Sequence, residues 1–212
     1  MLTFTSLLFR HFRISYVHIF RGMNHKVFVY GTLKRDQPNH HWLTDPENGF
    51  GKFLTEGKTK NKYPLIIATK YNIPFVLHSP GDGLNVKGEV YEVDNVMLGR
   101  LDILEDHPNY YEREVDDIII TSEKGEQQTI KCWIYFLKKF KKELLKRPMM
   151  DSYSSRGSHG LPYLERSKRD PSYDLKHAVK DDRVRSSVVI SSFVANAGCR
   201  AYYMPTTNMM HS

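Results

Sequence analysis

The stretch KVFVYGT, residues 26–32, decides the fold because it marks where the ordered core of the chain begins. Its apolar, β-branched and aromatic residues form a short run that ends at a glycine, which is typical of a buried strand entering a loop. Further strand-like runs follow, some punctuated by Pro or Gly and others alternating with a period of two. They span residues 61–70, 72–83, 86–93, 112–121 and 129–137. The core is therefore expected to be mainly β.

One helix is predicted between these strands. Asp94 or Asn95 can cap its start, and Pro108 forces its end. Its apolar face comprises Val96, Met97, Leu98, Leu101 and Leu104. Residues 134–148, IYFLKKFKKELLKRP, begin like a strand and continue as a candidate basic amphipathic helix. The pattern predicts an α+β fold, with a predominantly antiparallel or barrel-like sheet into which helices are inserted.

The net charge of +7 suggests nucleic-acid binding, since basic proteins bind phosphate through counterion release. The charge is not spread evenly along the 212 residues, however. Residues 1–22 carry +3 and residues 166–212 carry +4, whereas residues 23–165 hold 20 basic and 20 acidic side chains. We therefore expect an N-terminal extension, a neutral folded domain at 23–165 and a basic, disordered tail. The charge then bears on targeting, solubility or gene structure rather than on catalysis.

The N-terminal extension, MLTFTSLLFRHFRISYVHIFRG, contains no acidic residue and mixes arginine with apolar side chains. Two interpretations stay open: a mitochondrial transit peptide, or an upstream extension with Met23 as the working start. A transit peptide would direct the protein to mitochondria, and otherwise we expect the cytoplasm. A reducing compartment fits the two cysteines, Cys132 and Cys199, which cannot form a disulfide framework. No apolar run approaches the roughly 18 residues of a membrane span, so none is expected.

The first candidate site is the loop Tyr30, Gly31, Thr32 and Leu33 at the end of the opening strand. A glycine at a strand end lets the backbone turn and approach a ligand closely, so successive N–H groups can point at a carboxylate or an oxyanion. The alternative is a plain turn that ends the strand. The GxxxxGK[ST] spacing of a Walker loop is absent.

The second candidate is the acidic cluster Asp102, Glu105 and Asp106 in the last turn of the predicted helix. Asp102 and Glu105 stand three residues apart and share a face, close to the negative end of the helix dipole. Both effects would raise a carboxyl pKa toward the range useful for acid and base chemistry. The alternative is a solvated acidic helix end.

Other residue types point away from several classes of chemistry. No HxxxH or CxxC motif is present, so we expect no metal and no cofactor, and the GxSxG signature of a serine nucleophile is also missing. The run KKFKKELLKR is best interpreted as a solvated face, although it could also lie on anionic lipid or bind an acidic partner. Tyr63, Tyr91, Tyr110 and Tyr111 either line a pocket or pack in the core.

Five blocks in a fixed order resemble a known family. They are VFVYGTLKRDQPNHHWL (27–43), NIPFVLHSPGDG (72–83), KGEVYEVD (87–94), LDILEDHPNYYERE (101–114) and DSYSSRGSHGL (151–161). Together they resemble the γ-glutamylamine cyclotransferases, within the wider AIG2-like γ-glutamylcyclotransferase superfamily. YGTL and the LDxxE segment are specific for the superfamily, and PNH, NIP, GEVY and DSYxSxGxHGL point to the γ-glutamylamine branch. The resemblance covers about 26–164, so both basic flanks lie outside it.

The resemblance implies a compact mixed β-barrel with flanking helices and one active-site cavity. It assigns substrate binding to Tyr30, Gly31, Thr32 and Leu33, and catalysis to Glu105. The implied reaction is intramolecular: the α-amino group of a γ-glutamyl amine, such as γ-glutamyl-ε-lysine from transglutaminase crosslinks, attacks its own γ-carbonyl. The products are 5-oxoproline and a free amine. No nucleophilic side chain, metal or cofactor is implied, and a monomer that acts on a small molecule is expected.

Two other functions are compatible with the sequence. The first is a non-catalytic module of the same fold, whose basic tails bind an acidic protein. The presence of both Glu105 and the YGTL loop argues against this, because a vestigial pocket needs neither. The second is nucleic-acid binding through the basic flanks, which would show a steep dependence on salt. We expect the enzyme, with no nucleic-acid partner.

Overall fold

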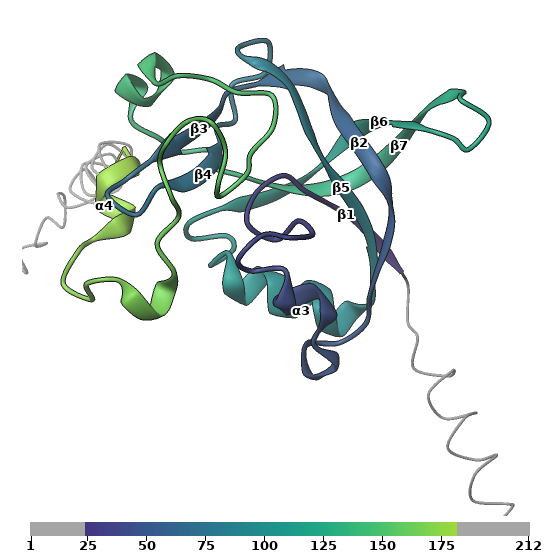
Figure 1. Ribbon diagram of the computed structural model, residues 1–212, viewed down its shortest axis with the longest axis horizontal. Coiled ribbons are helices and arrows are strands. Elements are labelled where there is room, and N and C mark those ends of the chain that lie inside the picture. The colour runs from purple at the N-terminus through teal and green to yellow at the C-terminus, as the bar shows by residue number, and fades with distance from the viewer. Residues whose placement is uncertain (1–23, 182–212) are drawn as a thin grey trace, which may run out of the picture.

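The computed structural model describes residues 24–181, and the two ends of the chain lie outside the described part. A closed barrel forms the centre of the molecule (Figure 1). Its strands, in the order in which they pair, are β1 (His25–Val29), β5 (Leu84–Val93), β2 (Gly51–Tyr63), β6 (Glu112–Thr121) and β7 (Gln127–Phe136). Neighbouring strands run antiparallel except β1 and β7, which pair in parallel at Val27 and Trp133. The predicted α+β, barrel-like fold is confirmed.

Helix α3 (Asn95–Leu104) is the helix that the sequence predicts. The Asp94 side chain caps it by accepting a hydrogen bond from the Met97 amide at 2.8 Å. The side chains that it buries recur at helical spacing and are Met97, Leu98, Leu101 and Leu104. Val96, which the pattern puts on the same face, is instead 58% exposed. The helix ends immediately before Glu105 and so holds that residue beside the barrel.

Strand β1 brings the chain from the core to the cavity described below. Val27 and Val29 pack in the same cluster as α3, whereas Phe28 and Tyr30 pack in a second cluster shared by the barrel strands. This follows from the alternation of side chains along a strand. β5 lies so close that a Cβ on Gly88 would stand 2.4 Å from the Val29 carbonyl oxygen. Glycine at that position therefore permits tight packing where the barrel closes.

A separate hairpin covers one side of the barrel. It consists of β3 (Leu65–Ala68) and β4 (Ile73–Val76), which pair antiparallel. The Leu77 amide donates to the Pro64 carbonyl at 3.0 Å, and Leu77 also forms a parallel bridge with Leu137 beyond β7. The strands predicted in the NKYPLIIATK and NIPFVLHSPGDG segments are therefore confirmed as the end of β2, β3 and β4.

The IYFLKKFKKELLKRP segment begins as a strand, as predicted, because β7 pairs with β6 over ten residues and continues to Phe136. The amphipathic helix predicted after it is wrong. Only the 3-10 helix η2 (Lys142–Lys146) follows, and it buries Leu144. The other short helices before it are α2 (His41–Thr44) and η1 (Pro46–Asn48). No helix between residues 24 and 181 is long and apolar enough to cross a membrane.

Residues 166–181, which the charge pattern assigns to the tail, pack on the domain. They contain η3 (Arg166–Lys168) and α4 (Leu175–Val179). Val179 is 1% exposed, and its carbonyl accepts a hydrogen bond from the Lys141 amide at 2.9 Å. The predicted tail has to be shortened accordingly, because a buried apolar side chain and backbone pairing hold even this polar segment in place. Residues 182–212 and the extension 1–22 lie outside the described residues.

Candidate active site

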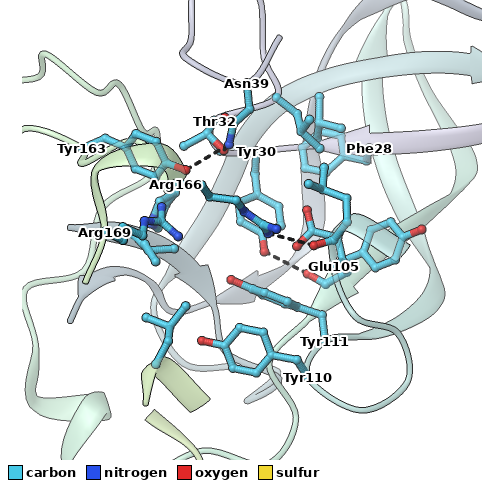
Figure 2. A pocket seen from close by; sticks show the side chains of 18 residues that line it. Phe28, Tyr30, Thr32, Asn39, Glu105, Tyr110, Tyr111, Tyr163, Arg166 and Arg169 are labelled. Atoms are coloured by element: carbon cyan, nitrogen blue, oxygen red, sulfur yellow. Dashed lines mark hydrogen bonds between the residues drawn. The ribbon is translucent and has the colours of Figure 1, made fainter. Parts of the chain in front are cut away.

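A cavity lies between the end of β1, the end of α3 and the segment that follows residue 162 (Figure 2). Its volume is about 80 Å³. All the residues that the resemblance assigns to substrate binding or catalysis line it: Tyr30, Gly31, Thr32, Leu33 and Glu105. Within residues 24–181, no three His, Cys, Asp or Glu side chains come together as metal ligands would. The chemistry available in the cavity is thus that of a carboxyl group, backbone amides, tyrosines and arginines.

The loop after β1 offers backbone donors. The amide N–H groups of Gly31, Thr32 and Leu33 donate to no acceptor among the described residues. The carbonyl side of the loop is engaged, because the Asn39 amide donates to the Thr32 carbonyl at 2.9 Å and the Lys34 amide donates to the Gly31 carbonyl at 3.3 Å. The loop is therefore held through its acceptors, which leaves its donors for an anionic ligand.

Side-chain contacts fix the same loop from both ends. The Asn39 side chain donates to the Thr32 hydroxyl at 2.9 Å, and the Lys34 ammonium donates to the Tyr153 carbonyl at 2.7 Å. A Cβ on Gly31 would stand 3.0 Å from Cγ of Pro74 at the start of β4. Glycine thus lets the loop approach the hairpin, and a larger residue would push the two apart.

Glu105 follows the last turn of α3, and its side chain faces the cavity among tyrosines (Figure 2). Burial raises the pKa of Glu105 to about 7, and the positive charge of Arg166 opposes this rise. The sequence predicts that the pKa of Glu105 is raised, which agrees with the structure. It attributes the rise to the like charge of Asp102 and to the helix dipole, whereas the main cause is burial. A carboxyl group that titrates near pH 7 can both accept and return a proton under physiological conditions.

The other two carboxylates of the acidic cluster hold the structure together. Asp102 accepts hydrogen bonds from the Arg113 guanidinium at 2.9 and 3.0 Å and from the Tyr135 hydroxyl at 2.7 Å. Asp106 pairs with Lys176 of α4, and this hydrogen bond lowers the pKa of Asp106. Neither residue lines the cavity. Within the predicted cluster, a single carboxyl group is therefore available to a ligand.

Aromatic side chains enclose this carboxyl group. Tyr110 and Tyr111 line the cavity and are 8% and 5% exposed, whereas Tyr63 and Tyr91 do not line it. The hydroxyls of the latter two donate to carboxylates at 2.8 and 2.9 Å, and their rings pack in the core. Of the four tyrosines weighed as pocket residues, two therefore belong to the cavity. Such apolar walls strengthen electrostatic interactions by excluding water.

Part of the cavity wall is missing from the sequence-based prediction. Tyr163, Arg166, Arg169 and Leu175 all line the cavity, although three of them belong to the predicted tail. Arg166 donates to the carbonyl of Leu104, the last residue of α3, at 2.9 Å. The spacing of the two arginines is the signal that was available, since residues three apart share one side of a helical turn. The sequence gives the charge of these two arginines but not their position beside the cavity.

Comparison with known proteins now places the chain. The sequence model of the family described as gamma-glutamyl cyclotransferase, AIG2-like, matches residues 27–155. The chain belongs to this family. Gamma-glutamylaminecyclotransferase C of Danio rerio is 44% identical to this chain over 146 residues, which cover 68% of this chain and 96% of the zebrafish protein. The Homo sapiens gamma-glutamylaminecyclotransferase is 43% identical over 150 residues, covering 68% of the chain and 98% of the human protein.

A solved structure supports the same assignment. The crystal structure of an AIG2-like protein from Mus musculus matches this chain with a TM-score of 0.66 and 40% sequence identity. The match covers 70% of the chain and all of the mouse protein. The fold that the resemblance implies is therefore confirmed, and the chain is a cyclotransferase, an enzyme that acts on γ-glutamyl compounds.

Proposed function

We propose that the cyclotransferase acts on γ-glutamyl amines, with γ-glutamyl-ε-lysine as the representative substrate, and releases 5-oxoproline and the free amine. The observation that carries the proposal is the pairing, in one cavity, of a carboxyl group whose pKa is about 7 with a loop of unpartnered N–H groups. The names of the human and zebrafish relatives favour γ-glutamyl amines over other γ-glutamyl compounds.

In the proposed reaction, the α-amino nitrogen forms a bond to the γ-carbonyl carbon of the same molecule. The Glu105 carboxylate first takes a proton from the α-ammonium group, which frees the nitrogen lone pair. It then gives that proton to the departing nitrogen as the original C–N bond breaks, which regenerates the carboxylate. The second proton that the ring nitrogen must lose to become the lactam N–H passes to the released amine, which leaves as an ammonium ion. A pKa near 7 suits both transfers, and such general acid and base catalysis contributes about 10² to 10⁴ in rate.

The loop of residues 30–33 has the role of holding negative charge. Its N–H groups would bind either the α-carboxylate of the substrate or the oxyanion that develops at the γ-carbonyl, where each donor contributes on the order of 3 kcal/mol. Folding the substrate so that its amine meets its carbonyl supplies a further gain, since well-oriented ring closures reach effective molarities of about 10⁵ M or more. The cavity walls would enforce this folded shape.

The direct test incubates the full chain with γ-glutamyl-ε-lysine, γ-glutamyl-alanine and glutathione, and follows 5-oxoproline by chromatography. We expect release mainly from the isopeptide. Preferential release from glutathione or γ-glutamyl-alanine would contradict the γ-glutamylamine assignment but retain a cyclotransferase. No release from any of the three would contradict the proposed activity.

We further propose that the enzyme works as a monomer, because Glu105 and the loop of residues 30–33 line one cavity of the same chain, and that it has no nucleic-acid partner. Size-exclusion chromatography with light scattering tests this, and a stable dimer would contradict it. For localisation we propose the cytoplasm, with mitochondria as the alternative if residues 1–22 act as a transit peptide. Imaging of a C-terminal fluorescent fusion, with and without residues 1–22, distinguishes the two.

A further inference from the structure

Arg169 is held in the cavity wall by contacts that leave part of its guanidinium without a partner. Its Nε donates to the Leu164 carbonyl at 2.9 Å, and its Cζ lies 5.0 Å and 5.3 Å from the ring centroids of Tyr163 and Tyr71. The Nη2 atom is buried and has no hydrogen-bond partner among the described residues. Figure 2 shows the guanidinium beside Tyr163 at the cavity. Buried guanidinium nitrogens normally have an acceptor, so a ligand is expected to supply one.

A second orphan donor belongs to the same cavity. The Tyr110 side chain is more than nine-tenths buried, and its hydroxyl has no hydrogen-bond partner within the described part of the chain. Its ring packs edge-on against Tyr111, with centroids 4.9 Å apart, so the hydroxyl has a fixed position. Leaving a buried hydroxyl unpaired is unfavourable, and a ligand acceptor would remove that cost.

We propose that Arg169, assisted by the Tyr110 hydroxyl, binds a carboxylate on the amine half of the substrate, so that the enzyme prefers γ-glutamyl amines whose leaving group carries a carboxylate remote from the leaving nitrogen, as ε-linked lysine does. A guanidinium and a hydroxyl together match a carboxylate, which accepts several hydrogen bonds and carries the opposite charge. This inference rests on the proposed function, because it concerns the leaving group of that reaction.

The substrate carries a second carboxylate, on its γ-glutamyl half, and the geometry favours a different site for it. The N–H groups of the loop at residues 30–33, which lines the same cavity as Glu105, offer donors to the γ-glutamyl half. Of the two arginines, Arg166 donates to the Leu104 carbonyl at the end of α3, next to Glu105, whereas Arg169 lies beside Tyr163 (Figure 2). Arg169 is thus the cation farther from the reacting centre, where the leaving group would extend.

The position of Arg169 in the chain supports a role in selectivity. It lies beyond residues 27–155, the part that matches the family as a whole. Its segment lies outside the strands of the barrel and is held by contacts with the hairpin, with α3 and with the chain after β7, such as Lys70 with Asp170, Arg166 with the Leu104 carbonyl, and Lys141 with the Val179 carbonyl. A wall of this kind can change between relatives without disturbing the barrel.

The test compares γ-glutamyl-ε-lysine with γ-glutamyl-cadaverine, which is the same molecule without the lysine carboxylate. The measured quantity is the ratio of kcat/KM for the two substrates, from 5-oxoproline release by the full chain. We expect wild-type enzyme to favour the lysine compound by about 10- to 100-fold, the range for a charge-assisted hydrogen bond. Arg169→Gln should bring the ratio close to one, by lowering kcat/KM for the lysine compound more than for the cadaverine compound.

Two further variants distinguish a loss of carboxylate binding from a loss of folding. Tyr110→Phe removes only the orphan hydroxyl and should lower the same ratio by a smaller factor. Arg156→Gln removes an equal charge from an exposed arginine that does not line the cavity, and should keep the wild-type ratio. Thermal unfolding of each variant checks its fold.

Each remaining outcome has a definite meaning. Equal losses on both substrates in Arg169→Gln would overturn the proposal, since Arg169 would then act on the γ-glutamyl half or on packing. A wild-type ratio near one would overturn it as well, with the cyclotransferase activity intact. If the wild-type enzyme released 5-oxoproline from neither substrate, the proposed function itself would fail, and this subsite with it.

Discussion

The cavity has two walls that differ in how they are built. The first, made of residues 30–33 and Glu105, continues directly from β1 and α3, whose side chains are packed in the core. The second, made of Tyr163, Arg166, Arg169 and Leu175, follows the last strand and is tied down by partly exposed pairs such as Lys70 with Asp170. Precise chemistry requires rigid support, whereas recognition of a variable leaving group does not. We therefore propose that the reaction takes place at the first wall and that the second wall determines selectivity.

The largest effect is expected from the first wall. Glu105→Gln is nearly isosteric but cannot accept the proton, so we expect kcat for 5-oxoproline release to fall by about 10² to 10⁴. The folded state should persist, because the amide is neutral and the carboxyl group is already disfavoured in its charged form by burial. Steady-state kinetics with γ-glutamyl-ε-lysine and circular dichroism together check this.

A matched control is Glu47→Gln, which makes the same change at an exposed glutamate away from the cavity. Turnover of that variant should equal wild type. Near-wild-type turnover by Glu105→Gln would show that the first wall does not supply the proton acceptor, and would contradict the proposed difference between the two walls.

The pH dependence should report on the same carboxyl group. Because burial raises the pKa of Glu105 to about 7, the base form is depleted below that pH, and kcat/KM should fall about tenfold per pH unit there. Between the plateau and pH 5 the loss should reach about 100-fold. The measurement is kcat/KM across pH 5–9, because kcat/KM reports the pKa of the free enzyme. A flat profile across pH 5–8 would contradict Glu105 as the proton acceptor.

Truncation tests the second wall as a unit. A chain that ends at Asp181 retains the whole described domain, and we expect it to keep wild-type kcat/KM for γ-glutamyl-ε-lysine. A chain that ends at Glu165 loses both arginines and the buried Val179, so kcat/KM should fall by about tenfold or more. Equal activity of the two chains would show that residues 166–181 contribute nothing to turnover, and the second wall would lose its proposed role.

The first wall could be predicted from sequence because its signals are local. An apolar run ending in glycine gives β1 and its loop, and a cap followed by helical spacing gives α3 and the position of Glu105. The barrel closure depends on a contact between Val27 and Trp133, which are remote in sequence and carry no pairing signal. Only tertiary structure reveals such contacts.

The second wall escaped prediction for a related reason. Net charge by segment treats Arg166 and Arg169 as two positive charges in a polar stretch, and polar stretches after the last strand are usually solvated. What fixes them is one buried side chain, Val179, together with contacts to α3 and to the tyrosines of the cavity. The expectation that the charge of the flanks is unrelated to the site is therefore wrong for these two arginines, since both line the cavity and the charge of Arg166 acts on Glu105.

The smallest effect on turnover should come from Asp102, which lies beside the first wall without lining it. Asp102→Asn weakens its hydrogen bonds with Arg113 and Tyr135 in a setting where the Asp102 side chain is 24% exposed. We expect the free energy of unfolding in urea to fall by about 1–3 kcal/mol, because Arg113 loses its charged partner. Since kcat depends on Glu105, it should change only a few-fold. Asp151→Asn, in a more exposed pair with Lys87, should cost less stability. A loss of kcat in Asp102→Asn as large as in Glu105→Gln would mean that the acidic cluster acts as one unit, against the division of roles that the hydrogen bonds indicate.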